Sequence, residues 1–393
     1  MTRTDGPEAL LADLLEETSL VIACGPGGVG KTTTAAALGL AAAASLDARV
    51  LVLTVDPARR LADALGLDGI GNDVAEVPAS FFTALGHEAR GSLSVAMLDA
   101  GASWDRLIRT TAPSPEVAEE IISNPLYRNI TTRFARGHEY IAMERIFELV
   151  GTGEFDLLIL DTPPSQSAID LLDAPERMAD FFSSRLLGWL TAPLRSRLLN
   201  FATRPFTALA DRVLGTQFLT DTSRFFLLLQ GMYDGFVERS NAVAALLREP
   251  TTLFVVVTTP ETIPVNEARR FVDALKARSL RLGVVIANKV LPSSLLDADT
   301  LQAAGRMVAD TEALEADLAE SGIEDAGGVA RVLAAISENF ENFAVLAGRQ
   351  RALLDELRSR HDVVIELPHL LDEVVDVEAL SRIGNLLLAE PTG

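Results

Sequence analysis

Short apolar runs, rich in β-branched residues, recur along the chain and are separated by longer stretches with helical spacing. Polar residues, glycine or proline bound each run, which is typical of strands buried on both faces. The pattern therefore predicts an α/β fold, with a mostly parallel sheet and helices on both of its faces. The predicted strands cover residues 19–24, 49–55, 156–160, 253–258, 282–287 and 362–367.

Two long stretches interrupt this pattern and predict helices without strands. Residues 99–150 are broken by Pro113, Pro115 and Pro125, and residues 170–249 form a second helical stretch. The segment 178–248 contains eight of the 17 phenylalanines of the chain. Ordinary packing of helices against each other would explain these rings, and so would an apolar client surface. Adjacent pairs such as Phe225 and Phe226 point about 100° apart on a helix, which makes both hard to bury.

Composition narrows the function classes for this chain of 393 residues. It has 34 basic and 55 acidic residues, a net charge of −21, which disfavours nucleic-acid binding. We find no apolar run of 18 residues and no signal-peptide pattern at the start, so we expect a cytoplasmic protein whose membrane contact is at most indirect. A single cysteine, Cys24, excludes a disulfide framework and a zinc site built on paired thiols within one chain.

Residues 25–32, with the sequence GPGGVGKT, match the phosphate-binding pattern G-x-x-x-x-G-K-[ST]. The first predicted strand leads into the motif and a predicted helix follows it, as this chemistry requires. Glycines let backbone N–H groups surround phosphate oxygens, and the helix N-terminus adds partial positive charge. Lys31 can reach the β- and γ-phosphates, and Thr32 can bind Mg²⁺. The fold class is therefore a P-loop NTPase with an inserted helical subdomain.

This assignment divides the chain into five predicted segments. The nucleotide-binding core is interrupted twice by helices and resumes after each interruption. The segments are the first part of the core at 1–98, a helical insertion at 99–150, a core strand and second switch at 151–169, a helical, aromatic-rich subdomain at 170–249, and the last part of the core at 250–393.

Two aspartates end predicted strands and are candidates for the chemistry at the phosphates. Asp161 follows the run 157–160, as in a Walker B strand, and Asp56 follows the strand 49–55. Ligands of open parallel sheets bind at the carboxyl ends of strands, so both carboxylates should reach the phosphate side. The alternative for each is a helix cap.

The base is less clearly specified by the sequence. Asn288 and Lys289 resemble the start of the guanine-reading motif N-K-x-D, but its fourth position is Leu291. Because the carboxylate that grips guanine is missing, adenine is the better match, and ATP the expected nucleotide. Asn288 could also merely close a turn. The loop 367–369, which contains Pro368, could form a wall of the base site.

Taken together, these motifs resemble those of the ArsA family, which comprises arsenite-pump ATPases and ATPases that target tail-anchored membrane proteins. The likeness covers most of the chain and looks closest to actinobacterial ArsA-like ATPases, which often occur as paired paralogues. The pieces that carry it are GGVGKTTT at 27–34, EYIAME at 139–144, TVDPA at 54–58, DTPPS at 161–165, TPE at 259–261, EAR at 267–269, Asn288 and LPHLLDEV at 367–374.

The resemblance implies a dimeric ATPase and assigns roles to matching positions. Asp56 would activate the attacking water and Lys31 would act with it in catalysis. Thr32 would bind Mg²⁺ directly, and Asp161 would do so through water. Adenine would lie against Asn288 and Pro368. The phosphates would be held by Gly27, Gly28, Val29, Gly30, Lys31, Thr32 and Thr33.

Departures from the family pattern also carry information. The family's signature lysine, which reaches the partner's nucleotide, falls on Pro26, and no other lysine is near in sequence. Arg59 or Arg60 could compensate within the chain. Otherwise we expect slow hydrolysis by this chain alone and activation by a lysine-bearing paralogue. Cys24 is alone, so neither the zinc clasp nor the three thiols of an arsenite site can form, and we expect no metalloid site.

Three functions remain open. The leading one is an ATPase whose nucleotide state moves a helical subdomain that binds a hydrophobic protein client or a partner, in a homodimer or a heterodimer. The second is a nucleotide-gated scaffold with weak hydrolysis, suggested by Pro26. The third is a partition-type positioning ATPase, which usually needs a basic surface or an amphipathic tail. The C-terminal leucines 386–388 lack a basic face.

Overall fold

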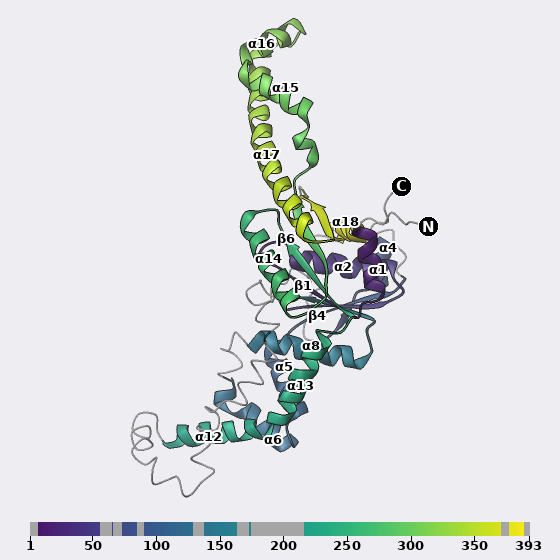
Figure 1. Ribbon diagram of the computed structural model, residues 1–393, viewed down its shortest axis with the longest axis vertical. Coiled ribbons are helices and arrows are strands. Elements are labelled where there is room, and N and C mark those ends of the chain that lie inside the picture. The colour runs from purple at the N-terminus through teal and green to yellow at the C-terminus, as the bar shows by residue number, and fades with distance from the viewer. Residues whose placement is uncertain are drawn as a thin grey trace.

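The computed structural model describes residues 7–55, 65, 73–84, 90–128, 137–162, 173, 216–370 and 377–388. The described chain is elongated: a β-sheet with flanking helices occupies the middle, and groups of helices extend from it in two opposite directions (Figure 1). The sheet carries the candidate site.

Eight strands form one sheet in the order β3-β4-β2-β5-β1-β6-β7-β8. All neighbours are parallel except β3, which runs antiparallel to β4. The predicted mostly parallel α/β sheet is confirmed, whereas the edge strand β3 and its neighbour β4 were not predicted. The strands are β1 Leu20–Cys24, β2 Arg49–Thr54, β3 Ala75–Glu76, β4 Ser92–Met97, β5 Leu157–Asp161, β6 Thr252–Thr258, β7 Leu282–Val290 and β8 Val364–Pro368.

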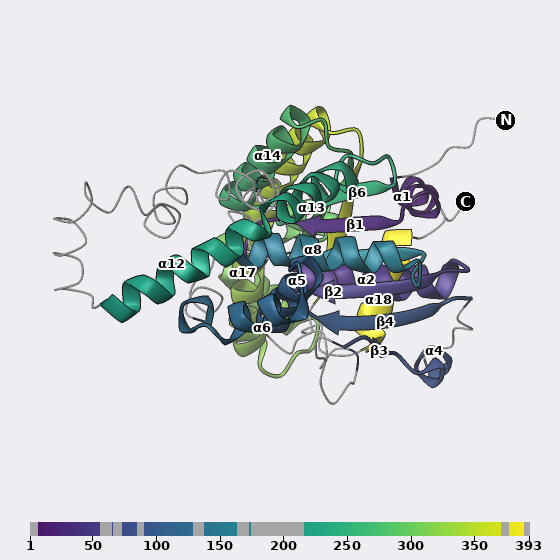
Figure 2. The same ribbon diagram turned by 90° about the horizontal axis from the view of Figure 1, so that it is seen from below.

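Helices cover both faces of the sheet, which explains why β1, β5 and β6 are buried at every position (Figure 2). On one face lie α1 (Pro7–Glu16), α2 (Lys31–Ser45), α4 (Ala79–Ala84) and α18 (Val377–Leu388). The other face packs against α8 (Gly137–Thr152), α13 (Tyr233–Leu246), α14 (Thr262–Ala277) and the last part of α17 (Ala326–Arg360).

The C-terminal helix α18 belongs to the first of these layers. Leu380, Ile383 and Leu387 are buried in the same apolar core as α1 and α2. Leu386 remains exposed. Most of the apolar face of α18 is thus used for intramolecular packing.

A second helical core lies beyond the second face of the sheet. It joins α5 (Ala100–Thr111), α6 (Pro115–Ser123), α8, α12 (Thr216–Gly231) and α13, and we call these five helices the helical layer. Helices expected in the stretches 99–150 and 170–249 therefore share one apolar core. Phe225 is buried in it, and Phe226 is partly buried against it. The two rings pack edge to face, and only one of them is fully buried, in keeping with the expectation that adjacent rings on a helix are hard to bury together.

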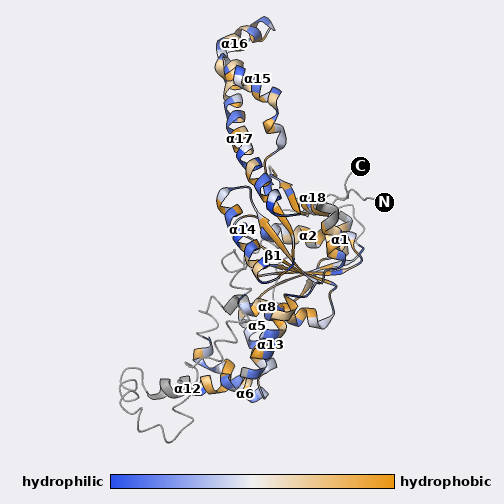
Figure 3. Cartoon of the chain, in the orientation of Figure 1, coloured by the Kyte–Doolittle hydropathy of each residue, from blue (hydrophilic) through white to orange (hydrophobic). Residues whose placement is uncertain are grey.

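A helical hairpin projects from the sheet on the opposite side of the molecule, between β7 and the edge strand β8 (Figure 1). It consists of the short 3₁₀ turn Ser293–Leu296, α15 (Ala298–Ala309), α16 (Thr311–Glu320) and the first part of α17. Apolar and polar residues are mixed along its length (Figure 3). The sequence pattern did not single out this projection.

The described helices differ in length or apolar character from helices that cross a membrane. None of them, the 35-residue α17 included, combines the length and the apolar character that crossing a membrane requires.

Candidate nucleotide site

The turn between β1 and α2 has the backbone geometry of a phosphate-binding loop. Gly28 and Gly30 have φ values of 78° and 93°, a left-handed region that side chains disfavour. Gly25 lies so close to the carbonyl oxygen of Val257 that a Cβ would collide with it. The sequence therefore needs glycine at these positions, and the resulting loop leads directly into the N-terminus of α2, as a phosphate site requires.

Lys31 is the first residue of α2, and its side chain is buried. Its Nζ donates a hydrogen bond to the carbonyl oxygen of Pro26, at 2.8 Å. The ammonium group therefore lies back over the loop that precedes its own helix. This position suits a cation that neutralises phosphate charge.

Asp161 ends β5, which lies between β1 and β2 in the sheet. The carboxylate is buried, and its Oδ2 accepts hydrogen bonds from Thr32 Oγ1 at 2.6 Å and from Thr54 Oγ1 at 2.9 Å. A threonine hydroxyl next to a carboxylate is a donor set that suits Mg²⁺, which prefers oxygen ligands and keeps several waters. The residues present therefore fit a magnesium ion bound with a nucleotide.

Thr54 was not among the predicted site residues. It ends β2 and is the register partner of Asp161 across the parallel pair of strands. One signal in the sequence pointed to Thr54: it is a polar residue at the last position of an otherwise apolar run. Its proximity to Asp161 could not be predicted, because β2 and β5 pair although they lie more than 100 residues apart in sequence.

Asn288 and Lys289 lie near the end of β7 and both contact the phosphate loop. Asn288 Nδ2 donates to the carbonyl oxygen of Val29 at 2.8 Å, and Lys289 Nζ donates to that of Gly28 at 3.2 Å. The backbone of Lys289 is left-handed, with φ 60°. The expectation that no other lysine is near the loop, drawn from sequence distance, is wrong: the sheet brings Lys289 to it.

Pro368 ends β8, the neighbour of β7, and is exposed. It is the register partner of Val290, and the amide of His369 donates to the Val290 carbonyl oxygen at 2.8 Å. The structure therefore brings the loop 367–369 beside Asn288. Both lie at the carboxyl-terminal ends of the parallel strands, as the phosphate loop does. Asp56, Arg59, Arg60 and residues 163–167 of the second switch lie outside the described residues.

Cys24, at the end of β1, is fully buried. Burial raises the pKa of its thiol to about 12, although a hydrogen bond with Thr162 and the charge of Lys31 act in the opposite direction. The thiol therefore stays protonated and is a poor nucleophile and metal ligand. Within the part of the chain that the structure describes, no three His, Cys, Asp or Glu side chains gather as a metal site.

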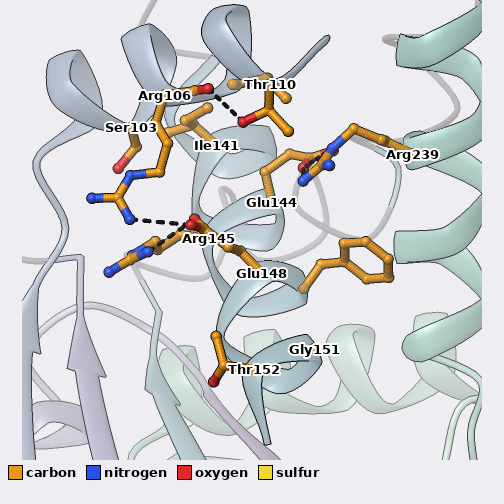
Figure 4. Close-up of a pocket in the computed structure, with 12 residues that line it drawn as sticks. Ser103, Arg106, Thr110, Ile141, Glu144, Arg145, Glu148, Gly151, Thr152 and Arg239 are labelled. Atoms are coloured by element: carbon orange, nitrogen blue, oxygen red, sulfur yellow. Dashed lines mark hydrogen bonds and ion pairs between the residues drawn. The ribbon is translucent and has the colours of Figure 1, made fainter. Parts of the chain in front are cut away.

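A second polar cluster lies in the helical layer, around a cavity of about 340 Å³ between α5, α8 and α13 (Figure 4). Arg106 and Arg145 both donate to Glu148, at 3.1 and 2.9 Å. Burial acts to raise the pKa of Glu148, but these two arginines outweigh it and lower the pKa. Arg239 of α13 pairs with Glu144 of α8 at 2.8 Å. The cluster thus ties three helices of the layer together.

The fold and the loop geometry define a P-loop nucleoside triphosphatase of the α/β class. The family model described as "Anion-transporting ATPase" matches residues 18–309, and the chain belongs to this family, ArsA_ATPase. The protein is accordingly a P-loop ATP hydrolase. The matched range includes the phosphate loop, Asp161 and Asn288 but ends before α16 and α17.

Individual relatives agree with this assignment. The chain is 24% identical over 312 residues to the ATPase ARSA2 of Chlamydomonas reinhardtii, covering 77% of each chain. It is 26% identical over 296 residues to the ATPase get3 of Schizosaccharomyces japonicus, covering 74% of this chain and 79% of the relative. The ATPase GET3A of Arabidopsis thaliana is 24% identical over 290 residues, with 73% and 72% covered.

Proposed function

We propose that the protein uses binding and hydrolysis of Mg²⁺·ATP to move its helical layer, which binds a hydrophobic protein client or a partner subunit. One observation carries this proposal: α8 belongs to two apolar cores. Met143, Ile146 and Leu149 pack under the sheet. Tyr140 and Ile141 of the same helix pack within the helical layer. The next strand after α8 is β5, which ends at Asp161, so a single connection links the layer to the nucleotide site.

The chain's own residues would divide the work at the nucleotide as follows. Loop amides at 27–33 and the Lys31 ammonium hold the phosphates, and the Thr32 hydroxyl is the direct ligand for magnesium. A bound magnesium ion supplies positive charge at the phosphate oxygens. Asp161 holds a water of that ion, and Asp56 orients the attacking water. Asn288 and Pro368 hold the adenine.

The hydrogen bond between Thr32 and Asp161 suggests how nucleotide binding reaches α8. The hydroxyl donates directly to the carboxylate at 2.6 Å. The Thr32 oxygen could bind magnesium through a lone pair while its hydroxyl proton stays directed at Asp161, so both side chains would adjust together around the ion. The end of β5 would then shift relative to β1. Because α8 precedes β5 and packs in both cores, the shift would pass into the helical layer.

Hydrogen exchange of the full chain, with and without Mg²⁺·ATP, tests this proposal. We expect ATP to change exchange in α8, α12 and α13, because these helices share the core that would move. The hairpin helices α15 and α16 serve as the internal control. The Lys31→Ala variant should lose the response. An unchanged helical layer in the wild-type chain under saturating ATP would contradict the proposal.

A second candidate, a nucleotide-gated scaffold with weak hydrolysis, rests on Pro26. Proline has neither a side-chain charge nor a backbone N–H, so it cannot replace the family's signature lysine. A paralogue carrying that lysine would then pair with this chain across the nucleotide and supply the charge from outside. Steady-state hydrolysis by the isolated chain separates the two candidates. Turnover that is fast alone and unaffected by Pro26→Lys favours the first.

A further inference from the structure

The projecting part of α17 has two faces of opposite character. The fully buried residues on the face that packs against α15 and α16 are small: Ala330, Ser337, Ala344 and Ala347. Of the large apolar side chains in this part of α17, Leu333 and Phe340 are partly buried, whereas the most exposed ones lie on another face. A surface helix ordinarily turns its large apolar residues toward its own core.

The exposed residues form a regular stripe, which we call the α17 stripe. Among the described residues, eight of the eleven exposed large apolar side chains lie between 298 and 360. Val332 and Ile336 are each 59% exposed, and Phe343 is 50% exposed. The stripe consists of Val329, Val332, Ile336, Asn339, Phe343 and Leu346.

The spacing of the stripe is that of a helix that packs against another helix. Successive members are separated by three, four, three, four and three residues, which are the a and d positions of a heptad repeat. Asn339 is the single polar member. Such a contiguous apolar strip on a projecting helix marks an interaction surface. The family model ends at residue 309, before this helix begins.

We propose that the α17 stripe binds the same stripe of a second copy of this chain, with the two helices antiparallel. Charge argues for this occupant and this direction. The tip of the hairpin, residues 310–325, contains seven acidic and no basic residues. Parallel pairing would place two such tips side by side. Residues 349–360, at the other end of α17, contain four arginines and two acidic residues, and three of these arginines also pair with carboxylates of their own chain. Antiparallel pairing places each acidic tip beside this arginine-rich end.

The dimensions of the stripe fit the same arrangement. Its midpoint lies between residues 337 and 338, so a two-fold axis there aligns Val329 of one copy with Leu346 of the other. Val332 then meets Phe343, and Ile336 meets Asn339. In the same register, residue 325 meets residue 350. These are the two limits of the exposed helix: Asp325 caps α17, and Gln350 accepts a hydrogen bond from the Leu291 amide of the core at 2.9 Å.

This register also pairs specific charges. Glu324 and Arg349 are both exposed, one at each end of the stripe. The antiparallel two-fold places Glu324 of each copy opposite position 351 and within two residues of Arg349 of the other, so the contact is made twice. The interface is separate from the nucleotide face and does not depend on ATP hydrolysis.

Sedimentation of the full chain without nucleotide, over a wide range of protein concentration, tests the proposal. We expect a dimer, and we expect Ile336→Glu to raise its dissociation constant by at least about 100-fold, because the two-fold buries two unpaired carboxylates. Val345→Glu is the matched control. Val345 is equally exposed on the same helix, at 55%, but lies roughly 150° around it from the stripe. A chain that stays monomeric at all concentrations, or a dimer that Ile336→Glu leaves intact, overturns the proposal.

Disulfide trapping tests whether the two α17 helices are antiparallel. The natural cysteine, Cys24, is buried and should not take part in cross-linking. An equimolar mixture of Val329→Cys and Leu346→Cys chains should cross-link, and neither chain alone should. Cross-linking of Val329→Cys with itself would overturn the antiparallel arrangement. Arg349→Glu should weaken the dimer about 10-fold, and the double exchange Glu324→Arg with Arg349→Glu should restore it. A double variant as weak as the single one would contradict the assigned register.

Discussion

Asp161 receives two hydroxyl hydrogen bonds on the same oxygen, from Thr32 on α2 and from Thr54 on β2. The strands β5 and β2 and the helix α2 therefore meet at a single carboxylate. This carboxylate lies at the carboxyl-terminal ends of the strands, where the phosphate loop also lies. Both hydroxyls donate to the same oxygen, which holds the carboxylate in a fixed position. A negative charge held in place before the ligand arrives is what a magnesium-bound water needs.

The first prediction concerns this charge. Asp161→Asn should reduce ATP hydrolysis by roughly 100-fold while ATP binding without magnesium persists, because the amide cannot attract a metal-bound water as a carboxylate does. Asp156→Asn is the control, since Asp156 lies at the opposite end of β5 and pairs with Arg49 at 2.8 Å. The measurements are single-turnover hydrolysis and nucleotide affinity. Equal hydrolysis by both variants would refute the assigned role.

Lys289 offers a second prediction at this scale. Its ammonium contacts the phosphate loop from β7, so it can supply within the chain part of the charge that Pro26 lacks. Lys289→Ala should lower turnover about 10-fold or more, and Pro26→Lys should restore part of the loss. The exposed Lys276, on α14, gives the control Lys276→Ala. If Pro26→Lys accelerates Lys289→Ala no more than it accelerates the wild type, the two positions do not substitute for each other.

At the level of single residues, the sequence was informative where spacing itself encodes geometry. The glycines and Lys31 of the loop could be predicted because the motif is local and each glycine has a backbone reason. The contacts that Thr54 and Lys289 make in the site could not be predicted. These contacts depend on which strands become neighbours, and that pairing is decided by the packing of the whole sheet.

Among the elements, α12 decides between two interpretations of the phenylalanine-rich stretch. Phe225 and Phe226 are neighbours on this helix, but only Phe225 is fully buried, at 1% exposed. Phe225→Ala should lower the free energy of unfolding by about 3–5 kcal/mol, the cost of a large cavity, and Phe226→Ala by clearly less. Denaturant unfolding measures both. Equal small losses would mean that the α12 rings are not a packed core.

The base of α17 should give the protein a pH-dependent stability. Burial, and after it the charge of Lys276, lower the pKa of His361, against the opposing effect of Asp273. As the pH falls below about 6.5, the unfolded chain takes up a proton that the folded chain resists, so stability decreases until the folded pKa is passed. His361→Gln should remove up to about 1.4 kcal/mol per pH unit of this loss. Identical pH profiles of stability for both proteins would contradict this.

At the level of elements, burial decides which strands can be predicted from the sequence. Strands covered on both faces are continuous apolar runs, so β1, β2, β5, β6, β7 and β8 were predictable. The strand β4 has the sequence SLSVAM, in which serines interrupt the run. The hairpin could not be predicted because the fully buried residues of its intramolecular face on α17 are small and form no apolar run. Its large apolar residues follow a heptad that makes sense only beside another helix.

At the scale of the whole molecule, three regions follow one another along the long axis (Figure 1). The sheet with the candidate nucleotide site lies in the middle, the helical layer lies on one side of it and the hairpin on the other. A change at Asp161 would therefore act on the layer through α8, whereas association through the α17 stripe would leave the layer accessible.

Coupling between the nucleotide site and the helical layer can be measured directly through Trp104. This side chain lies on α5, partly buried, with its ring 6.2 Å from that of Tyr140 on α8. The chain has two tryptophans, so Trp189→Phe leaves Trp104 as the only one. We predict that Mg²⁺·ATP changes Trp104 fluorescence in this variant and has no effect once Lys31→Ala is added. Unchanged fluorescence in the Trp189→Phe protein, with ATP binding verified by calorimetry in the same sample, would contradict the proposed coupling.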